Sequence, residues 1–118
     1  MALLIFVVSL AGQSAAAKID IVSVIGCLKE SAPNTWMVVN ATDAAPSNAN
    51  APQPKDIPAT PPVGKNEFRL IGVSEFNLPA QRDKAVMVKG LFIKATPASR
   101  LNITSVTTIA PSCPAPAR

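Results

Sequence analysis

Three glycines lie inside apolar, β-forming segments, and their positions constrain the fold more than any other feature. They interrupt the segments 24–28, 70–73 and 84–94 at Gly26, Gly72 and Gly90. In the longest segment, apolar residues recur with a period of two, as in a strand with one buried face. A glycine within such a strand allows a bend or the close approach of a neighbour. Because bent strands let a sheet curl, the sequence predicts a small, strongly curved β-sheet.

The alternation of apolar residues predicts five strands in all. They are expected over 19–28, 35–42, 67–73, 84–94 and 101–109. The pair Pro33-Asn34 predicts a tight turn, and therefore an antiparallel hairpin, between the first two strands. Residues 74–83 have too little periodicity for a full helix, so we expect one helical turn or a tight loop there, with Phe76 and Leu78 against the core.

A proline-rich segment separates the second and third expected strands. Residues 43–66 hold six of the twelve prolines of the chain and few residues that a core would bury. Because proline lacks a backbone N–H, this segment cannot form a central strand. We expect a long, mobile loop, and a functional arm is the alternative.

The first seventeen residues have the pattern of a secretory signal peptide. An apolar run over 3–10, too short to span a bilayer, leads to an A-x-A cleavage site at Ala15-Ala16-Ala17. No Lys or Arg precedes this run. Cleavage after Ala17 gives a mature chain that begins at Lys18, in the periplasm or outside the cell. A buried N-terminal strand is the alternative.

Two cysteines, Cys27 and Cys113, lie far apart in the chain. An even pair in an oxidising compartment predicts a disulfide that closes a long loop. Two free buried thiols are one alternative. Lipid attachment at Cys27 is another, because the residues just before it have the types found in a lipobox. Against it, Lys18 and Asp20 interrupt the apolar segment that a lipoprotein signal needs.

Five strands, an opening hairpin and a short element between the third and fourth strands match the OB-fold, a five-stranded Greek-key barrel. A small β-sandwich is the alternative. The predicted fold is therefore all-β, with a single OB-like barrel domain over 18–118 and the proline-rich loop 43–66 between its second and third strands.

The chain also resembles a set of short exported bacterial proteins with an OB-like domain of unknown function. The motifs are Gly26-Cys27-Leu28, Trp36, Ala41-Thr42, Phe68-Arg69-Leu70-Ile71-Gly72, Val86-Met87-Val88-Lys89-Gly90-Leu91, Leu101-Asn102-Ile103-Thr104-Ser105 and Cys113. This resemblance covers the whole mature chain and implies export and the OB-like fold. It supplies no activity. The turn Arg82-Asp83-Lys84 departs from the pattern, because we expect a glycine before the fourth strand.

The residue content argues against catalysis and metal binding. The chain has no His, which is the commonest general base and metal ligand. None of its seven acids form a pair on one strand face, and its two cysteines are too far apart in sequence to suggest a zinc site. We therefore expect no enzyme activity, no metal and no cofactor. An enzyme of unrecognised type is the alternative.

Binding is the remaining hypothesis, because OB-folds bind ligands on the face of their second and third strands. On that face the candidate ligand-binding residues are Trp36, Phe68, Arg69 and Lys65. Only 4% of the chain is aromatic, so burial of Trp36 and Phe68 in the core is the competing interpretation. The net charge of +4 comes from scattered basic residues, and no nucleic-acid site is predicted. We expect a monomer without a membrane span that binds a glycan, a peptide or an envelope protein.

Overall fold

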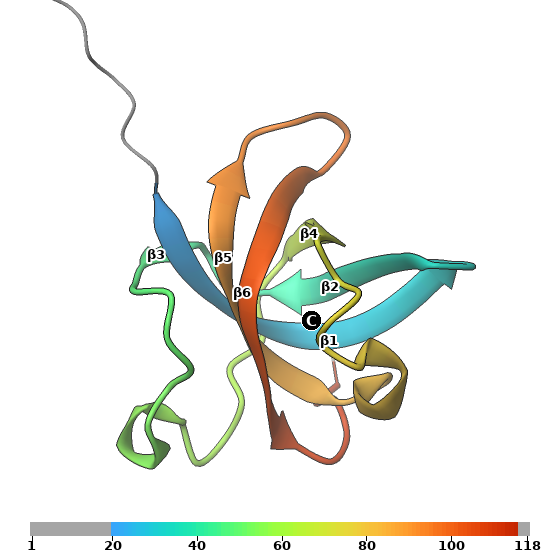
Figure 1. Ribbon diagram of the computed structural model, residues 1–118. Helices are drawn as coiled ribbons and strands as arrows, with labels where there is room; N and C mark the ends of the chain where they lie inside the picture. The colour runs from blue at the N-terminus through green and yellow to red at the C-terminus, as the bar shows by residue number, and fades with distance from the viewer. Residues whose placement is uncertain (1–19, 116–118) are drawn as a thin grey trace, which may run out of the picture.

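The computed structural model describes residues 20–115 as an all-β fold (Figure 1). Its elements are the strands β1 (Ile21–Ala32), β2 (Thr35–Ala41), β3 (Ala45–Pro46), β4 (Asn66–Ile71), β5 (Ala85–Ile93) and β6 (Ser99–Ala110), with the short 3-10 helices η2 (Pro54–Asp56) and η3 (Leu78–Gln81). The five predicted strands correspond to all of these strands except β3, and the predicted helical turn corresponds to η3. The predicted signal peptide lies outside the described residues.

The strands form one mixed sheet that closes into a ring. Neighbours pair in the order β1, β2, β4, β6, β5 and back to β1, and the two-residue β3 pairs with the beginning of β1. Every pair is antiparallel except β4 with β6, which is parallel. The predicted hairpin of β1 and β2 is confirmed, and Asn34 in its turn has a φ of 59°. Asparagine tolerates this left-handed conformation better than most residues.

β1 is long because it pairs with two neighbouring strands, one after the other. Residues 21–27 pair with β5, whereas residues 27–32 pair with β2. Gly26 lies at this change of partner, and a Cβ at that position would be 2.8 Å from the backbone oxygen of Val39 on β2. A side chain would therefore hold the strands apart at the point where β1 changes its partner, so Gly26 allows the close approach that the sequence predicts.

The other two glycines differ from each other. Gly90 lies inside β5, where a Cβ would be 2.6 Å from the backbone oxygen of Asn102 on β6. Gly72 instead follows the last residue of β4 with a φ of 69°, so it ends that strand and does not bend it. The strand predicted over 67–73 is thus too long at this end. In the turn before β5, Asp83 takes a φ of 65° where we expect a glycine.

The core fills the inside of the ring. Its buried side chains are Val22, Val24, Leu28, Trp36, Val38, Ala41, Phe68, Leu70, Leu78, Val86, Val88, Leu101 and Ile103. Phe68 meets Phe92 edge to face, with ring centroids 6.4 Å apart, a geometry that aromatic rings favour. Leu78 of η3 is buried in this core and Phe76 packs against it, as expected.

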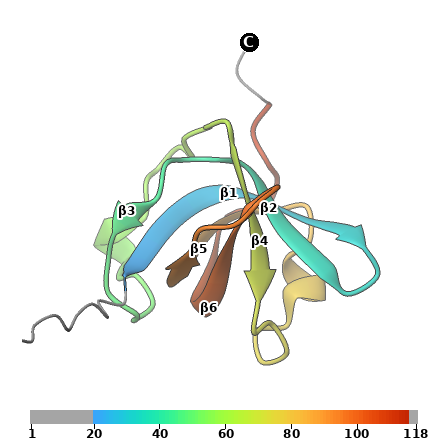
Figure 2. The same cartoon turned by 90° about the horizontal axis from the view of Figure 1, so that it is seen from above.

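The proline-rich segment is an arm held against the sheet, and we use "the arm" for residues 43–65. Near its start, the Ser47 N–H donates a hydrogen bond to the Ile21 oxygen at 2.9 Å. At its end, the Gly64 N–H donates to the Asn40 oxygen, also at 2.9 Å. Between these points the arm runs along the outer side of β1 (Figure 2). The proline-rich loop expected between the second and third predicted strands thus lies against the sheet and covers part of β1.

Candidate functional site

The four residues predicted to bind a ligand do not share one exposed face. Trp36 and Phe68 are 4% and 5% exposed, and both belong to the core. Arg69 of β4 and Lys65 of the arm are exposed. The prediction is corrected on this point, because consecutive strand residues such as Phe68 and Arg69 project to opposite faces of a sheet. The competing interpretation, that both aromatic residues are needed by the core, is confirmed.

Arg69 instead belongs to a row of outward-facing residues that crosses four strands. In register, Arg69 pairs with Met37 of β2 and with Arg100 of β6, and Arg100 pairs with Ile93 of β5. Residues opposite each other in a sheet project to the same face and lie within contact of one another. Both arginines are exposed, and Ile93 is 40% exposed. We refer to Met37, Arg69, Arg100 and Ile93 as the arginine row.

The two arginines have no carboxylate partner within the described part of the chain. Both ion pairs found there involve other residues, Lys29 with Asp83 and Arg82 with Glu30. Neighbouring strands are about 4.8 Å apart, so the two guanidinium groups can converge on one anion. Like charges directly opposite each other destabilise a sheet.

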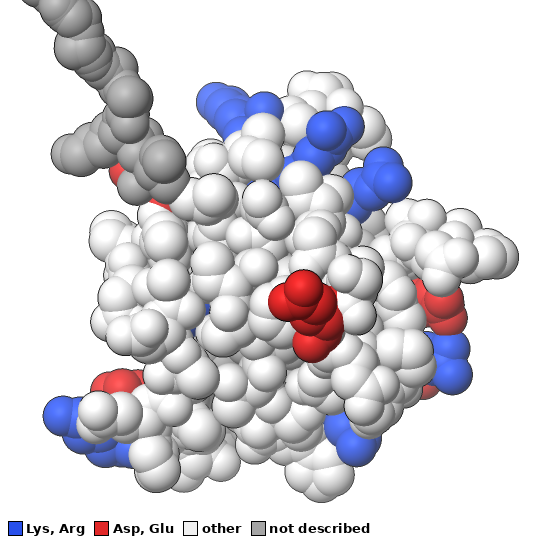
Figure 3. All heavy atoms as spheres, in the orientation of Figure 1, with Lys and Arg blue, Asp and Glu red and all other residues white. Residues whose placement is uncertain are grey.

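Lys94 extends the positive charge of the arginine row. It follows Ile93 at the end of β5 and is exposed. Figure 3 shows Lys and Arg side chains gathered at the end of the molecule where the β5–β6 connection lies, apart from the acidic side chains on that face. Each guanidinium offers a planar fork of donors that matches a carboxylate, sulfate or phosphate. The flanking Met37 and Ile93 add apolar surface for contact with the rest of a ligand.

A disulfide joins Cys27 of β1 to Cys113 of the C-terminal tail, as predicted. Their Cα atoms are 5.5 Å apart, within the usual range for a disulfide, and the bond spans 86 positions. The sulfur of Cys27 is therefore already bonded. The structure therefore agrees with the predicted disulfide and not with the alternatives considered for the pair, lipid attachment at Cys27 and two free thiols.

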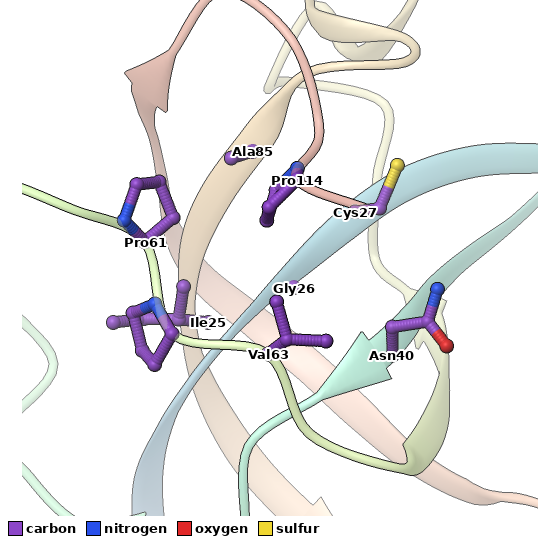
Figure 4. A pocket seen from close by; sticks show the side chains of 9 residues that line it. Ile25, Gly26, Cys27, Asn40, Pro61, Val63, Ala85 and Pro114 are labelled. Carbon is purple, nitrogen blue, oxygen red and sulfur yellow. The ribbon is translucent and has the colours of Figure 1, made fainter. Parts of the chain in front are cut away.

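A small cavity lies beside the disulfide, where the arm and the tail meet β1 (Figure 4). Pro61 and Val63 of the arm line it together with Ile25 of β1 and Pro114 of the tail. Its volume of about 10 Å³ is room for about one water molecule. The cavity is too small for a ligand. It shows that the arm and the tail cover the same part of β1.

Arg100 is the site residue that sequence reasoning missed. The sequence places it in the connection over 96–100, whereas β6 already begins at Ser99. Its partner Arg69 is brought alongside by the parallel pairing of β4 with β6. No local pattern predicts a parallel contact between distant strands. The available signal is the alternation of Arg100 with the buried Leu101, which extends the last strand backward by one residue.

Within residues 20–115, no group of three or more His, Cys, Asp or Glu side chains is placed to hold a metal ion. That same range contains no helix long and apolar enough to cross a membrane. Comparisons of the chain with protein-family models, with curated protein sequences and with solved structures gave no match. The function is therefore argued from the geometry of this chain alone.

Proposed function

We propose that this protein is an exported OB-like barrel module that binds an anionic ligand, an acidic glycan by preference, through the arginine row. The observation that carries the proposal is the direct juxtaposition of Arg69 and Arg100 on neighbouring strands. No carboxylate of the described residues pairs with either of them. An anionic ligand bound between the two guanidinium groups would offset their mutual repulsion.

The order of strand pairing supports the OB-like assignment. β5 returns to lie beside β1, which gives the spatial order β5, β1, β2, β4 of a Greek key. β6 then pairs with both β4 and β5 and closes the ring. OB-folds bind ligands on the face of their second and third strands and on the adjoining loops. Here those strands are β2 and β4, which carry Met37 and Arg69, and the β5–β6 connection carries Lys94.

The chemistry of the arginine row favours binding over catalysis. A guanidinium group stays protonated in proteins, so it cannot act as a general base. It does bind carboxylate and sulfate groups through paired hydrogen bonds. Nucleic acid is not the anion expected outside the cytoplasm, whereas acidic glycans carry these groups in repeated units. We therefore propose recognition of a glycan with no catalytic step.

The disulfide supports the proposed location. Disulfides persist in oxidising compartments and are rare in the cytosol. The proposal predicts that protein recovered from the periplasm or the medium begins at Lys18 and contains the Cys27–Cys113 bond. Intact-mass measurement with and without reductant tests for both the N-terminus at Lys18 and the disulfide. Full-length, reduced protein recovered from the cytosol would contradict the proposed export.

Glycan binding is tested on an array of neutral, uronate-bearing and sulfated oligosaccharides. We expect acidic members to be retained and neutral ones to be washed off, with weaker retention at higher salt because charge attraction is screened. Replacing both arginines (Arg69→Ala with Arg100→Ala) should weaken binding of the acidic members at least tenfold, since two charge-assisted contacts are lost.

The matched control is Arg82→Ala, which removes an arginine that pairs with Glu30 at another place on the surface. It should leave glycan binding unchanged. Binding of neutral oligosaccharides alone, or an equal loss in the control and the double variant, would contradict the proposed role of the arginine row.

A further inference from the structure

The arm and the outer face of the sheet form a polar cleft made of two adjoining hollows. The larger, of about 360 Å³, lies between the arm and the strands β1 and β5. The smaller, of about 260 Å³, lies mainly within the arm. Asn48, Asp56 and Lys89 line both hollows. The volume of the larger hollow by itself lies within the range of small-molecule binding sites. We refer to the two hollows together as the arm cleft.

Lys89 is a buried charged residue on the wall of the arm cleft. It is 7% exposed, because it projects outward from β5 and the arm covers it. In register it lies between Ser23 of β1 and Ser105 of β6. Among the described residues, its Nζ donates one long hydrogen bond, to Asn48 Oδ1 at 3.4 Å. The buried Ser105 Oγ has no partner there.

The residues from 20 to 115 therefore use only part of the hydrogen-bonding capacity of Lys89. A lysine ammonium has three donors, and its contact with Asn48 occupies one of them. Burying a charge without partners is costly, so buried charges are normally paired. A carboxylate that enters the arm cleft would supply both the missing acceptors and the opposite charge.

Asp56 places the opposite charge in the same cleft. It ends η2, and its Oδ2 accepts a hydrogen bond from the Gln53 N–H at 3.2 Å. Asp56 and Lys89 line both hollows, yet neither belongs to an ion pair among the described residues. Lys55 lines only the smaller hollow. The cleft thus presents an ammonium and a carboxylate that form no ion pair with any of residues 20–115.

We propose that the arm cleft binds a small zwitterion, an α-amino acid or a short peptide, with its carboxylate at Lys89 and its ammonium at Asp56. The carboxamides of Asn48, Asn50 and Gln53 line the cleft and match the amide groups of a peptide. This site is separate from the arginine row, because the arm covers it and none of the residues that line it belongs to the row. Either site can therefore fail its test without affecting the other.

The first experiment varies the ligand and needs no variant protein. The folded, disulfide-bonded protein is titrated with L-Ala-L-Ala, with its N-acetyl form and with its C-terminal amide, and binding is followed by calorimetry and by amide chemical shifts. We expect the zwitterion to bind tightest and each blocked form to bind at least tenfold more weakly, because each lacks one charge-assisted contact. Equal affinities for the three compounds, or no binding of any, would overturn the proposal.

The second experiment assigns the two contacts. Lys89→Met should weaken binding of the dipeptide at least tenfold and leave binding of its C-terminal amide unchanged, since the amide has no carboxylate to lose. Asp56→Asn should weaken binding of the dipeptide at least tenfold and leave binding of its N-acetyl form unchanged, since the N-acetyl form has no ammonium to lose. Lys84→Met is the control: it makes the same replacement five positions earlier, just before β5, and should leave all three affinities unchanged.

Two results of these titrations would count against the arm cleft as the binding site. If Lys89→Met weakens the dipeptide and the amide equally, Lys89 only supports the shape of the cleft and the proposal is overturned. If the double replacement of Arg69 and Arg100 by alanine removes dipeptide binding, the peptide binds at the arginine row and the assignment to the arm cleft is wrong.

Discussion

The two outer faces of the ring are built from similar strands but lie in different environments. On β5, the outward-facing Met87 and Lys89 are 6% and 7% exposed, because the arm lies over them. On β4, the outward-facing Glu67 and Arg69 are exposed. In both strands successive side chains point to opposite faces, yet burial alternates along β4 and not along the first six residues of β5. Alternation therefore identifies the residues that face the core, but it does not tell what covers the other side of the strand.

Substitutions on the covered side and on the open face should therefore have different effects on stability and on binding. The arm turns part of the outer side of β1 and β5 into a second interior, so the apolar side chains there should stabilise the fold as core residues do, beside the polar cleft that Lys89 lines. Side chains on the open face of β2, β4 and β6 should contribute little to stability and much to binding. Substitutions on each face test this division, and their expected effects run from the loss of the disulfide down to changes at the arginine row.

The disulfide should have the largest effect, because it holds the tail over the covered side. Replacing both Cys27 and Cys113 by serine should lower the free energy of unfolding by about 4 kcal/mol, since the bond closes a loop that spans 86 positions. Urea unfolding followed by tryptophan fluorescence measures the loss. Reductant added to the wild type should reproduce it, and a loss below about 1 kcal/mol would contradict the prediction.

Two methionines make a matched pair across the comparison. Met87→Ala on the covered face should lower the free energy of unfolding by about 2 to 3 kcal/mol, the lower part of the usual range for truncating a buried side chain. Met37→Ala on the open face should cost less than about 1 kcal/mol, because surface changes are mild. Denaturant midpoints at constant m-value give both numbers. Equal losses would show that the arm does not create a second interior.

Thr42 tests how the arm is held where it leaves β2. Its Oγ1 accepts a hydrogen bond from the Ile25 N–H at 3.0 Å. Thr42→Val should cost about 1 to 2 kcal/mol, because the partly buried N–H loses its acceptor. The rate of hydrogen exchange at the Ile25 amide should rise in the same variant. Thr108→Val, which removes an exposed hydroxyl, should cost no more than about 0.5 kcal/mol.

The smallest effect on stability is expected at the arginine row. Single replacements of Arg69 or Arg100 by alanine should change the free energy of unfolding by no more than about 0.5 kcal/mol, as for most exposed residues. The double replacement should not lower the free energy of unfolding further than the single ones do, because it removes a like-charge contact. Thermal unfolding at low salt measures both. A loss above about 1.5 kcal/mol in either single variant would assign the arginines a structural role.

The parts of the fold that depend on local patterns could be predicted from the sequence. Alternation located the five long strands, and Pro33-Asn34 located the first hairpin. The cysteine count predicted the disulfide. The packing of the arm against the sheet could not be predicted in this way, because a proline-rich composition does not indicate which part of the protein the segment contacts. Its one local clue is Gly64, where a Cβ would collide with the backbone of Ala41.

The candidate site was harder to predict because it depends on pairing between distant strands. The sequence predicts Phe68 and Arg69 as members of one ligand-binding set, whereas strand geometry sends them to opposite faces. Arg100 joins Arg69 only through the parallel contact of β4 with β6. Lys89 resembles any surface lysine in the sequence, and only the position of the arm makes it buried. The predicted signal peptide over 1–17 remains a prediction.

The position of β6 has a consequence for how this chain can mature. β6 pairs with both β4 and β5, and the cysteine that bonds to β1 follows it. A chain that emerges N-terminus first, from a ribosome or a translocation channel, therefore holds an open sheet with two unpaired edges until β6 arrives. Native contacts between such distant segments form late, so the ring should close only after β6 has emerged.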